Sequence, residues 1–373
     1  MENPRPRGKK KRRVKLTKRF FIVCVIAALV IAGIISTIFL LNRNAVQQAA
    51  LTLAPFTAQD QYVYVGNGFF YLSGQELYYP DPANEKATLS VSVKNAVVQL
   101  AASSSIYALY NDVSVKIIGE EFPVEFAGTL FSVACGKSYI AALRQDTTGE
   151  ETIEVFGKNG AKYDTITTSG QYVIDYGFFE ADSEYLYVVG LTVNSSAPLS
   201  TITVYNVSRK STSGVMQVQS HLVEDMRFTK NSIYIVDTNQ IARYSLTDNT
   251  RSYSSTIYGW KVMDFDSTAA KPAYLLRPRS GSVLGAIKIL QLSDDAVATT
   301  VERQLQLPAA AIDAFLMNGK LIIVSPTGYT THDMTGRKLS EFTFAAAVEN
   351  AWKLDNTTLL FQAGSEMYTT KVA

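Results

Sequence analysis

The chain has 373 residues, of which 47% are hydrophobic and 18% are charged, and this composition excludes an intrinsically disordered protein. The net charge of +2 conceals an uneven distribution, because residues 1–19 carry ten Lys or Arg and a single acid, Glu2. Residues 44–373 carry 24 basic and 32 acidic residues, so the long part of the chain is mildly acidic and predicts no nucleic-acid partner.

A continuous apolar segment, FFIVCVIAALVIAGIISTIFLL, runs from Phe20 to Leu41. Its 22 residues would extend about 33 Å as a helix, enough to cross a hydrocarbon layer of about 30 Å. A cleaved signal peptide is the alternative, but its apolar region usually has about 7–15 residues, and no convincing cleavage motif follows the segment. The segment therefore predicts an uncleaved transmembrane helix.

The basic residues before this helix predict its orientation, because Lys and Arg concentrate on the cytoplasmic side of membrane proteins. Residues 1–19 are then a cytoplasmic tail, Phe20–Leu41 contacts the lipid bilayer, and the rest of the chain is extracytoplasmic. The expected location is the cell membrane, crossed once. Binding of the tail to nucleic acid, or its regulation by anionic lipid, is the less favoured alternative.

The extracytoplasmic part contains one cysteine, Cys135, and therefore no internal disulfide. A domain of this size can bury a sufficient core without one. The scarcity of cysteine is more typical of a bacterial surface protein than of a eukaryotic ectodomain. The glycosylation patterns that begin at Asn194, Asn206 and Asn356 would have no meaning in a bacterium.

A hairpin-like pattern recurs along the rest of the chain. Each copy has an aromatic or β-branched strand, a polar or glycine turn, and a second strand of alternating polarity. Eight copies are present, 33 to 48 residues apart, and they begin at Phe69, Ile106, Tyr139, Tyr185, Ile233, Tyr274, Leu321 and Leu359. Further candidate strands, such as residues 171–179 and 259–265, lie between the hairpins.

A repeat of about 40 residues with room for four strands is the period of a β-propeller blade. The pattern predicts an all-β propeller over residues 59–373, with eight blades and with seven as the alternative. No segment after the apolar helix has a convincing helical period. Residues 304–316 come closest, but Pro308 favours strand and loop there.

The last repeat ends at Ala373 after its second hairpin strand, so a further strand must come from elsewhere. Residues 42–58 form a predicted stalk, and within it Gln47–Phe56 precedes the first clear strand, at residues 61–65. This stretch is the candidate for closing the ring, with an open or shortened last blade as the alternative.

Two glycine motifs suggest nucleotide or phosphate binding at first sight. Gly66-Asn67-Gly68 has Tyr71 where a third glycine is needed, and a strand rather than a helix follows. The loop of residues 157–160, Gly-Lys-Asn-Gly, occupies the same place in its repeat as the polar turns of other repeats. Both motifs therefore predict tight turns between strands.

No catalytic, cofactor-binding or metal-ligating residue is predicted. The only histidines are His221 and His332, and neither lies in a metal-binding motif. Asp264-Phe265-Asp266 begins like a calcium loop, but Leu275 stands where a glutamate is required, which leaves an ordinary acidic pair at a strand end. His332 is interpreted as a surface or packing residue.

The remaining candidates are interpreted as core residues. Cys135 lies in the apolar run FSVACG and is expected to be buried. The many tyrosines and phenylalanines could form a platform for a carbohydrate or a peptide, but their places in strands favour packing between blades. Trp260 and Trp352, near the starts of strands, are likewise expected in the core.

The layout as a whole resembles an uncharacterised family of Firmicute, chiefly clostridial, single-pass membrane proteins, catalogued as domain of unknown function 5711. The resemblance covers the basic tail, the segment Phe20–Leu41 and repeats such as TIEVFGKNGAKYDTI and YTTHDMTGRKLSEF. The repeats are also distantly similar to the blades of WD-type and quinoprotein-type propellers, without the Trp-Asp pair of the former or the regular Trp of the latter. The resemblance implies a propeller ectodomain and carries no activity, cofactor or site residue with it.

These observations favour a non-enzymatic binding module held outside the membrane, for a protein, peptide or cell-wall ligand. A surface hydrolase with carboxylates in the central channel is the alternative, and a scaffold for assembly of the cell envelope is a third interpretation. A close pair of carboxylates at the channel mouth would favour the enzyme. Spacing in the sequence cannot decide this, because it does not give separation in space.

Overall fold

The computed structural model describes Ile31 and residues 46–372, except for residues 82–83, 94–97, 169, 180–183, 194–196, 220, 269–270, 282–283 and 293–300. Over the described part of residues 46–372 the chain forms strands and no helix. Among the described residues no helix has both the length and the apolar character needed to cross a membrane. The predicted transmembrane helix Phe20–Leu41 lies outside them, apart from Ile31.

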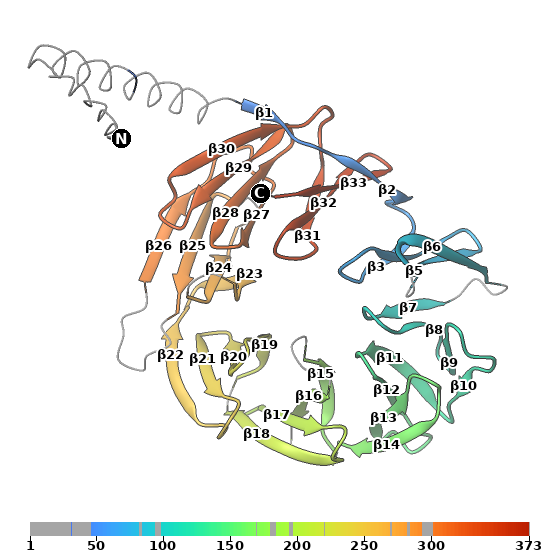
Figure 1. The fold of residues 1–373 in the computed structure, drawn as a ribbon. Helices are drawn as coiled ribbons and strands as arrows, with labels where there is room; N and C mark the ends of the chain where they lie inside the picture. The colour runs from blue at the N-terminus through green and yellow to red at the C-terminus, as the bar shows by residue number, and fades with distance from the viewer. Residues whose placement is uncertain are drawn as a thin grey trace, which may run out of the picture.

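The strands form eight sheets arranged in a ring around a central channel, which is the architecture of an eight-bladed β-propeller (Figure 1). Each sheet contains one sequence repeat, and two of the sheets also contain a strand from residues 46–57. The first strand of each sheet lies beside the channel, the next two strands are the repeated hairpin, and the fourth lies at the outer edge. The prediction of eight blades is confirmed, and the alternative of seven is wrong.

Blades 1 to 4 contain their strands in chain order from the channel outward. Blade 1 contains β3 (Gln61–Tyr64), β4 (Phe69–Ser73), β5 (Glu76–Asp81) and β6 (Asn84–Ser92), and blade 2 contains β7 (Gln99–Ala102), β8 (Tyr107–Tyr110), β9 (Ser114–Ile117) and β10 (Val124–Glu125). Blade 3 contains β11 (Thr129–Cys135), β12 (Tyr139–Gln145), β13 (Glu151–Gly157) and β14 (Lys162–Thr167). Blade 4 contains β15 (Tyr172–Phe178), β16 (Tyr185–Thr192), β17 (Leu199–Asn206) and β18 (Ser211–Gln219).

Blades 5 to 8 continue the same order, and the first two strands of the described chain join the last two blades. Blade 5 contains β19 (Val223–Phe228), β20 (Ser232–Asp237), β21 (Gln240–Ser245) and β22 (Arg251–Thr256), and blade 6 contains β23 (Trp260–Asp266), β24 (Ala273–Pro278), β25 (Ala286–Gln291) and β26 (Val301–Gln306). Blade 7 contains β27 (Asp313–Met317), β28 (Lys320–Ser325), β29 (Gly328–Asp333), β30 (Lys338–Thr343) and β1 (Val46–Gln48). Blade 8 contains β31 (Asn350–Lys353), β32 (Thr358–Ala363), β33 (Glu366–Lys371) and β2 (Thr52–Thr57).

Strand β2 supplies the outer strand of blade 8 and closes the ring. It pairs antiparallel with β33, Thr52 opposite Thr369. This segment was predicted from the sequence as the candidate for ring closure. The parallel pairing of β1 with β30, Val46 opposite Glu341, was not predicted. Two consecutive strands therefore join blades 7 and 8 from the outside (Figure 1).

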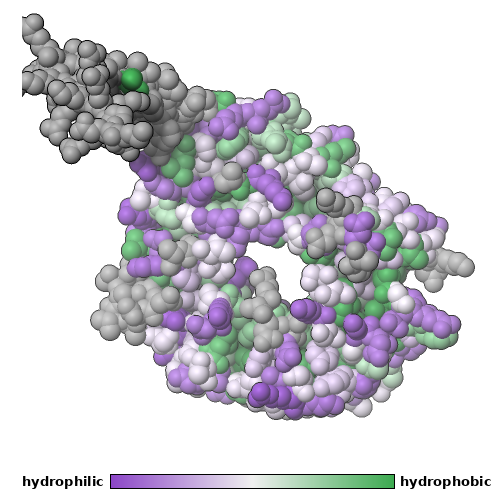
Figure 2. Space-filling view, in the orientation of Figure 1, coloured by the Kyte–Doolittle hydropathy of each residue, from purple (hydrophilic) through white to green (hydrophobic). Residues whose placement is uncertain are grey.

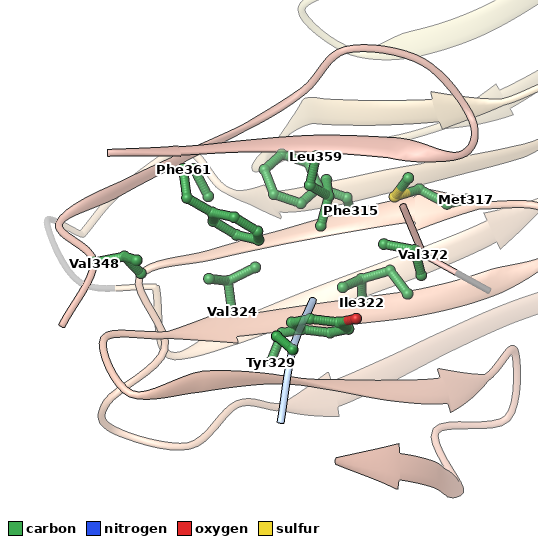
Figure 3. Packing of buried hydrophobic residues seen from close by; sticks show 11 residues of the cluster. Phe315, Met317, Ile322, Val324, Tyr329, Val348, Leu359, Phe361 and Val372 are labelled. Atoms are coloured by element: carbon green, nitrogen blue, oxygen red, sulfur yellow. The ribbon is translucent and has the colours of Figure 1, made fainter. Parts of the chain in front are cut away.

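The core consists of apolar clusters between the faces of neighbouring blades. Figure 3 shows the cluster between blades 7 and 8, where side chains of β27, β28 and β29 meet those of β32. Its labelled members are Phe315, Met317, Ile322, Val324, Tyr329, Val348, Leu359, Phe361 and Val372. Alternate residues of each strand point into such clusters, which accounts for the period-two pattern in the sequence.

The glycine motifs are turns, as predicted. The amide of Gly160 donates to the carbonyl of Gly157 at 2.9 Å, and Gly160 has a φ of +75°. Gly66 has a φ of +88° in the turn between β3 and β4. In the turns of blades 4 and 5 that correspond to residues 157–160, the positive φ falls on Lys210 and Asn249, at 50° and 57°. The turn geometry is thus retained where the residue type changes.

The ring has two distinct faces, because all innermost strands run in the same direction. The face that carries the starts of the innermost strands and the turns between the two middle strands of each blade is called the upper face. The lower face carries the remaining turns, including residues 157–160 and 66–68.

A candidate binding site in the central channel

An open channel passes through the centre of the ring (Figure 2). It contains a cavity of about 640 Å³ that is lined mainly by the innermost strands of blades 4 to 8. The lining combines carboxylates and two cations with aromatic side chains, among them Tyr187, Phe228, Phe315 and Trp352. Concave sites of this size with a few polar groups are typical of ligand binding.

One register position of the innermost strands is polar in all eight blades. In blades 1 to 5 and 8 this residue lies four positions before the residue whose amide closes the following turn on the lower face. In blades 6 and 7 the pairing register gives the same position. The eight residues are Gln61, Gln99, Ser132, Asp175, Asp225, Asp264, Asp313 and Asn350. We call them the polar ring, and it is acidic in blades 4 to 7 and neutral in the other four.

The acidic half of the polar ring has a sequence signature that the hairpin pattern does not reveal. The four aspartates occur in the triplets VID, VED, VMD and AID, which end at Asp175, Asp225, Asp264 and Asp313. Aligning the repeats on their innermost strands, rather than on their hairpins, would have revealed the pattern.

A β-bulge precedes the ring residue in blades 3 to 6. In each of these blades one residue of the innermost strand has no partner in the neighbouring strand, and the ring residue follows it directly. These four residues are Phe131, Ile174, Glu224 and Met263. Bulges of this kind bend the strand and change the direction of the side chains beside them.

Two of the four aspartates are paired with cations. Asp225 lies 2.9 Å from Arg227 in the same strand. Asp264 lies 3.0 Å from the Nζ of Lys353, which comes from blade 8. Burial raises the pKa of Asp264, and Lys353 and the amide of Leu316 oppose that rise.

Lys353 makes further contacts that tie three blades together. Its Nζ donates to the carbonyl of Phe265 at 2.9 Å and to that of Leu316 at 2.7 Å. Asp264 in turn accepts a hydrogen bond of 2.8 Å from the amide of Leu316. The side chains of Lys353 and Asp264 therefore connect blades 6, 7 and 8 inside the ring.

Asp175 and Asp313 have no ion-pair partner among the described residues. Burial raises the pKa of Asp313 to about 6, against the lowering effects of the Ala314 amide and of Arg277. Burial also raises the pKa of Asp175, against hydrogen bonds from the amide of Tyr176 and the hydroxyl of Tyr187. Asp313 lines the channel cavity, whereas Asp175 lines a smaller pocket between blades 3 and 4.

Replacing Asp313 by asparagine is expected to stabilise the protein at about pH 8 and to have little effect below about pH 4. The ordinary pKa of aspartate is about 3.9, and in the fold it is about 6. Between these two pKa values the unfolded chain therefore binds fewer protons than the folded chain, and the free energy of unfolding falls as the pH rises from the lower value to the higher. Above about pH 6 the ionised carboxylate lowers the free energy of unfolding by at most about 3 kcal/mol, and Asp313→Asn abolishes this effect.

Chemical denaturation at several pH values measures this effect, and Asp333→Asn is a control of opposite sign. Hydrogen bonding from Thr335 lowers the pKa of Asp333 to about 2, so its stabilising effect is present above about pH 4 and is lost toward pH 2. Asp333→Asn is therefore expected to destabilise at neutral pH. An Asp313→Asn variant with the wild-type pH dependence would show that this carboxylate does not resist ionisation in the fold.

Trp352 lies in the channel, and the prediction that it belongs to the core is wrong. Its side chain is 38% exposed and lines the cavity, while its neighbour Ala351 is buried. Alternation along β31 places these two side chains on opposite sides of the strand. Trp260 does pack as predicted, with the Nζ of Lys288 4.6 Å from its ring centre.

The histidines and the cysteine lie apart from one another and from the cavity. His332 bonds to the Gly336 carbonyl at 3.0 Å and to the Thr330 hydroxyl at 2.9 Å, which agrees with a packing role. His221 precedes β19 in another blade. Cys135 packs against the core between blades 2 and 3, and burial raises the pKa of its thiol to about 12.

The Asp264–Asp266 pair does lie at a strand end, but both side chains are buried and tie blade 6 to blade 7. Asp266 accepts a hydrogen bond of 2.6 Å from the Gly319 amide. The interpretation as an ordinary acidic pair was therefore incomplete. Among the described residues, His, Cys, Asp and Glu side chains form no group of three that could hold a metal ion.

Solved structures with the same fold cover nearly the whole propeller. BamB from Moraxella catarrhalis superposes with a TM-score of 0.54 at 11% identity, over 87% of this chain and 100% of that chain. The WD40 domain of SCAP from fission yeast gives 0.54 at 9% identity, over 87% and 98%. Sqt1 of Saccharomyces cerevisiae gives 0.52 at 10%, over 89% and 99%.

These similarities, with the eight sheets, define the chain as a β-propeller protein. At such low identity they show the fold alone. No family model matches the sequence, and no curated protein matches it. The resemblance to domain of unknown function 5711 stays a prediction.

Proposed function

We propose that the protein is a membrane-anchored, extracytoplasmic β-propeller that acts as a binding or scaffold module for a protein, peptide or cell-wall ligand. The observation that carries the proposal is the channel cavity, where the exposed Trp352 shares the lining with Asp264 and Asp313 of the polar ring. An indole in such a place offers a flat apolar surface to a sugar ring or a side chain. Asp313, which lines the same cavity, offers an acceptor to a donor of the same ligand.

The arrangement of the carboxylates favours binding over hydrolysis. Acid–base chemistry on a glycosidic bond needs two carboxyl groups that flank it. Asp264 is occupied by Lys353 and by the Leu316 amide, and Asp225 is occupied by Arg227. The two aspartates without a cation, Asp175 and Asp313, belong to blades 4 and 7. Among the ring aspartates, the two without a cation thus lie in blades that are not adjacent. Asp355 of blade 8, which also lines the cavity, accepts hydrogen bonds from the hydroxyls of Tyr64 and Thr358.

Membrane anchoring rests on the apolar segment Phe20–Leu41 and on the basic residues before it. The first described strand is β1, on the outer edge of blade 7. An anchor attached there would leave the channel free for a ligand.

Crosslinking in intact cells tests both parts of this proposal. Cells that express the full chain are treated with a membrane-impermeant crosslinker, and the products of the wild type, Trp352→Ala and Phe122→Ala are compared. Phe122 is 73% exposed in a turn of the lower face and serves as the matched control. We expect one specific product in the wild type and the control, reduced at least about tenfold by Trp352→Ala, which equals about 1.4 kcal/mol.

Two results would overturn the proposal in different ways. If the impermeant reagent leaves the propeller unmodified in intact cells, the extracytoplasmic location is wrong. If it modifies the propeller but no product depends on Trp352, the channel is not the binding site.

A further inference from the structure

Exposed apolar side chains concentrate on the upper face of blades 3 to 6. They lie at the starts of innermost strands, in the connections before them, or next to the turn between the middle strands. Six of them, which we call the upper crescent, are Phe131, Tyr172, Ile174, Val193, Leu222 and Tyr258. In the described turns of the lower face only Phe122 is a comparably exposed large apolar residue.

This difference between the faces is unlike a random scatter of surface apolar residues. Tyr258 is 79% exposed and Tyr172 is 60% exposed, so these side chains add almost nothing to the stability of the ring. Single exposed apolar residues need no explanation, but a set gathered on one face is typical of an interaction surface.

The exposed charges beside the upper crescent are acidic in blades 3 to 5, whereas Lys261 and Arg277 add two cations in blade 6. Glu150, Asp175 and Glu224 are exposed on the upper face of blades 3 to 5. On the described upper face of these three blades the one basic residue is Arg144, which forms an ion pair with Glu154 at 2.6 Å. Arg279 of blade 6 reaches Glu224 at 2.5 Å, which leaves Glu150 and Asp175 without a cation among the described residues.

We propose that the upper crescent docks a partner protein through a segment in which aliphatic or aromatic side chains alternate with lysine or arginine. This inference rests on the proposed function and names the chemistry of its partner. Apolar side chains of the segment would cover the crescent, and its cations would pair with the exposed carboxylates. An anionic lipid surface does not fit, because these carboxylates would repel its headgroups.

The direction of β1 agrees with this assignment. It runs parallel to β30, from the lower toward the upper face, with Val46 opposite Glu341 and Gln48 opposite Thr343. Val46, the first residue of β1, therefore lies at the lower-face end of that strand. A partner on the upper crescent would meet the propeller on the face away from the proposed anchor.

Peptide binding to the detergent-solubilised full chain tests the proposed chemistry. The probe is a labelled synthetic peptide of about ten residues that alternates leucine with lysine, compared with leucine–glutamate and serine–lysine peptides. The crescent variant is Tyr172→Ser, Leu222→Ser and Tyr258→Ser. The matched control, Leu53→Ser, Phe122→Ser and Val215→Ser, replaces residues that are 59%, 73% and 50% exposed on outer strands or on the lower face.

We expect the leucine–lysine peptide to bind most tightly, and to bind less tightly in higher salt because the carboxylates contribute. Its affinity is expected to fall at least about tenfold in the crescent variant and to stay unchanged in the control. Equal affinity of the two variants, or equal binding of the leucine–glutamate peptide, would overturn the proposal. Thermal melting monitors the fold, and Tyr258→Ser alone replaces the triple variant if that variant melts early.

The crosslinking experiment separates this inference from the proposed function. If no specific product forms in any variant, the binding function itself fails. If the Trp352-dependent product forms equally well in the crescent variant, the function stands and the assignment of the crescent is wrong.

Discussion

Replacing Lys353 by methionine is expected to lower the free energy of unfolding by about 3–5 kcal/mol. The Nζ of Lys353 lies 3.0 Å from Asp264 and donates to carbonyls of blades 6 and 7. Without it, the carboxylate of Asp264, a residue only 9% exposed, loses its cation and keeps only the amide donors of Phe265 and Leu316, and two carbonyl oxygens lose the Lys353 donor. Denaturant unfolding, followed by tryptophan fluorescence or circular dichroism, measures the loss.

A double-mutant cycle identifies the cause of this loss. Lys353→Met with Asp264→Asn is expected to be less destabilised than Lys353→Met alone, because no uncompensated buried charge remains. Lys371→Met, at an exposed position of β33, is the control and is expected to change stability by no more than about 0.5 kcal/mol. Additive effects of the two channel substitutions would show that Lys353 and Asp264 do not stabilise the ring as a pair.

Replacing Phe56 by alanine is expected to cost about 3–5 kcal/mol, because a large buried side chain leaves a cavity. Phe56 belongs to β2 and is 4% exposed. Its ring centre lies 4.5 Å from that of Tyr62 and 4.8 Å from that of Phe69, both in blade 1. The side chain thus attaches the closing strand of blade 8 to the next blade.

The control for Phe56→Ala is Phe122→Ala, which removes an equally large side chain from an exposed turn. Thermal unfolding of the two variants is compared with that of the wild type, and only Phe56→Ala is expected to melt earlier. Equal melting temperatures for all three proteins would contradict the closure of the ring by β2 in solution.

The architecture of the propeller was predictable from local patterns. The repeated hairpins became the two middle strands of every blade, and the candidate strands at residues 171–179 and 259–265 became β15 and β23. Residues 304–316 contain the end of β26 and the start of β27, as the proline suggested. The short last repeat indicated where the closing strand lies, because a blade that lacks a strand must obtain it from the other end of the chain.

The channel was only partly predictable. The aspartate triplets are visible in the sequence once the repeats are aligned on their innermost strands, but nothing in them indicates which carboxylates are neutralised. The partner of Asp264 is Lys353, 89 residues further along the chain. The exposure of Trp352 was missed for a related reason, since an apolar residue in a strand does not reveal whether its side faces a blade or the channel.

By itself the sequence determined the period, the strand content and the turn chemistry of the described part, because alternation and turn preferences depend on residues close together in the chain. The tertiary structure decided which side chains meet across the ring. Closure brings the polar ring to one level of the channel, ties blades 6 to 8 through Lys353, and gathers apolar residues of blades 3 to 6 on one face. These contacts join residues tens to hundreds of positions apart, and only the folded ring brings them together.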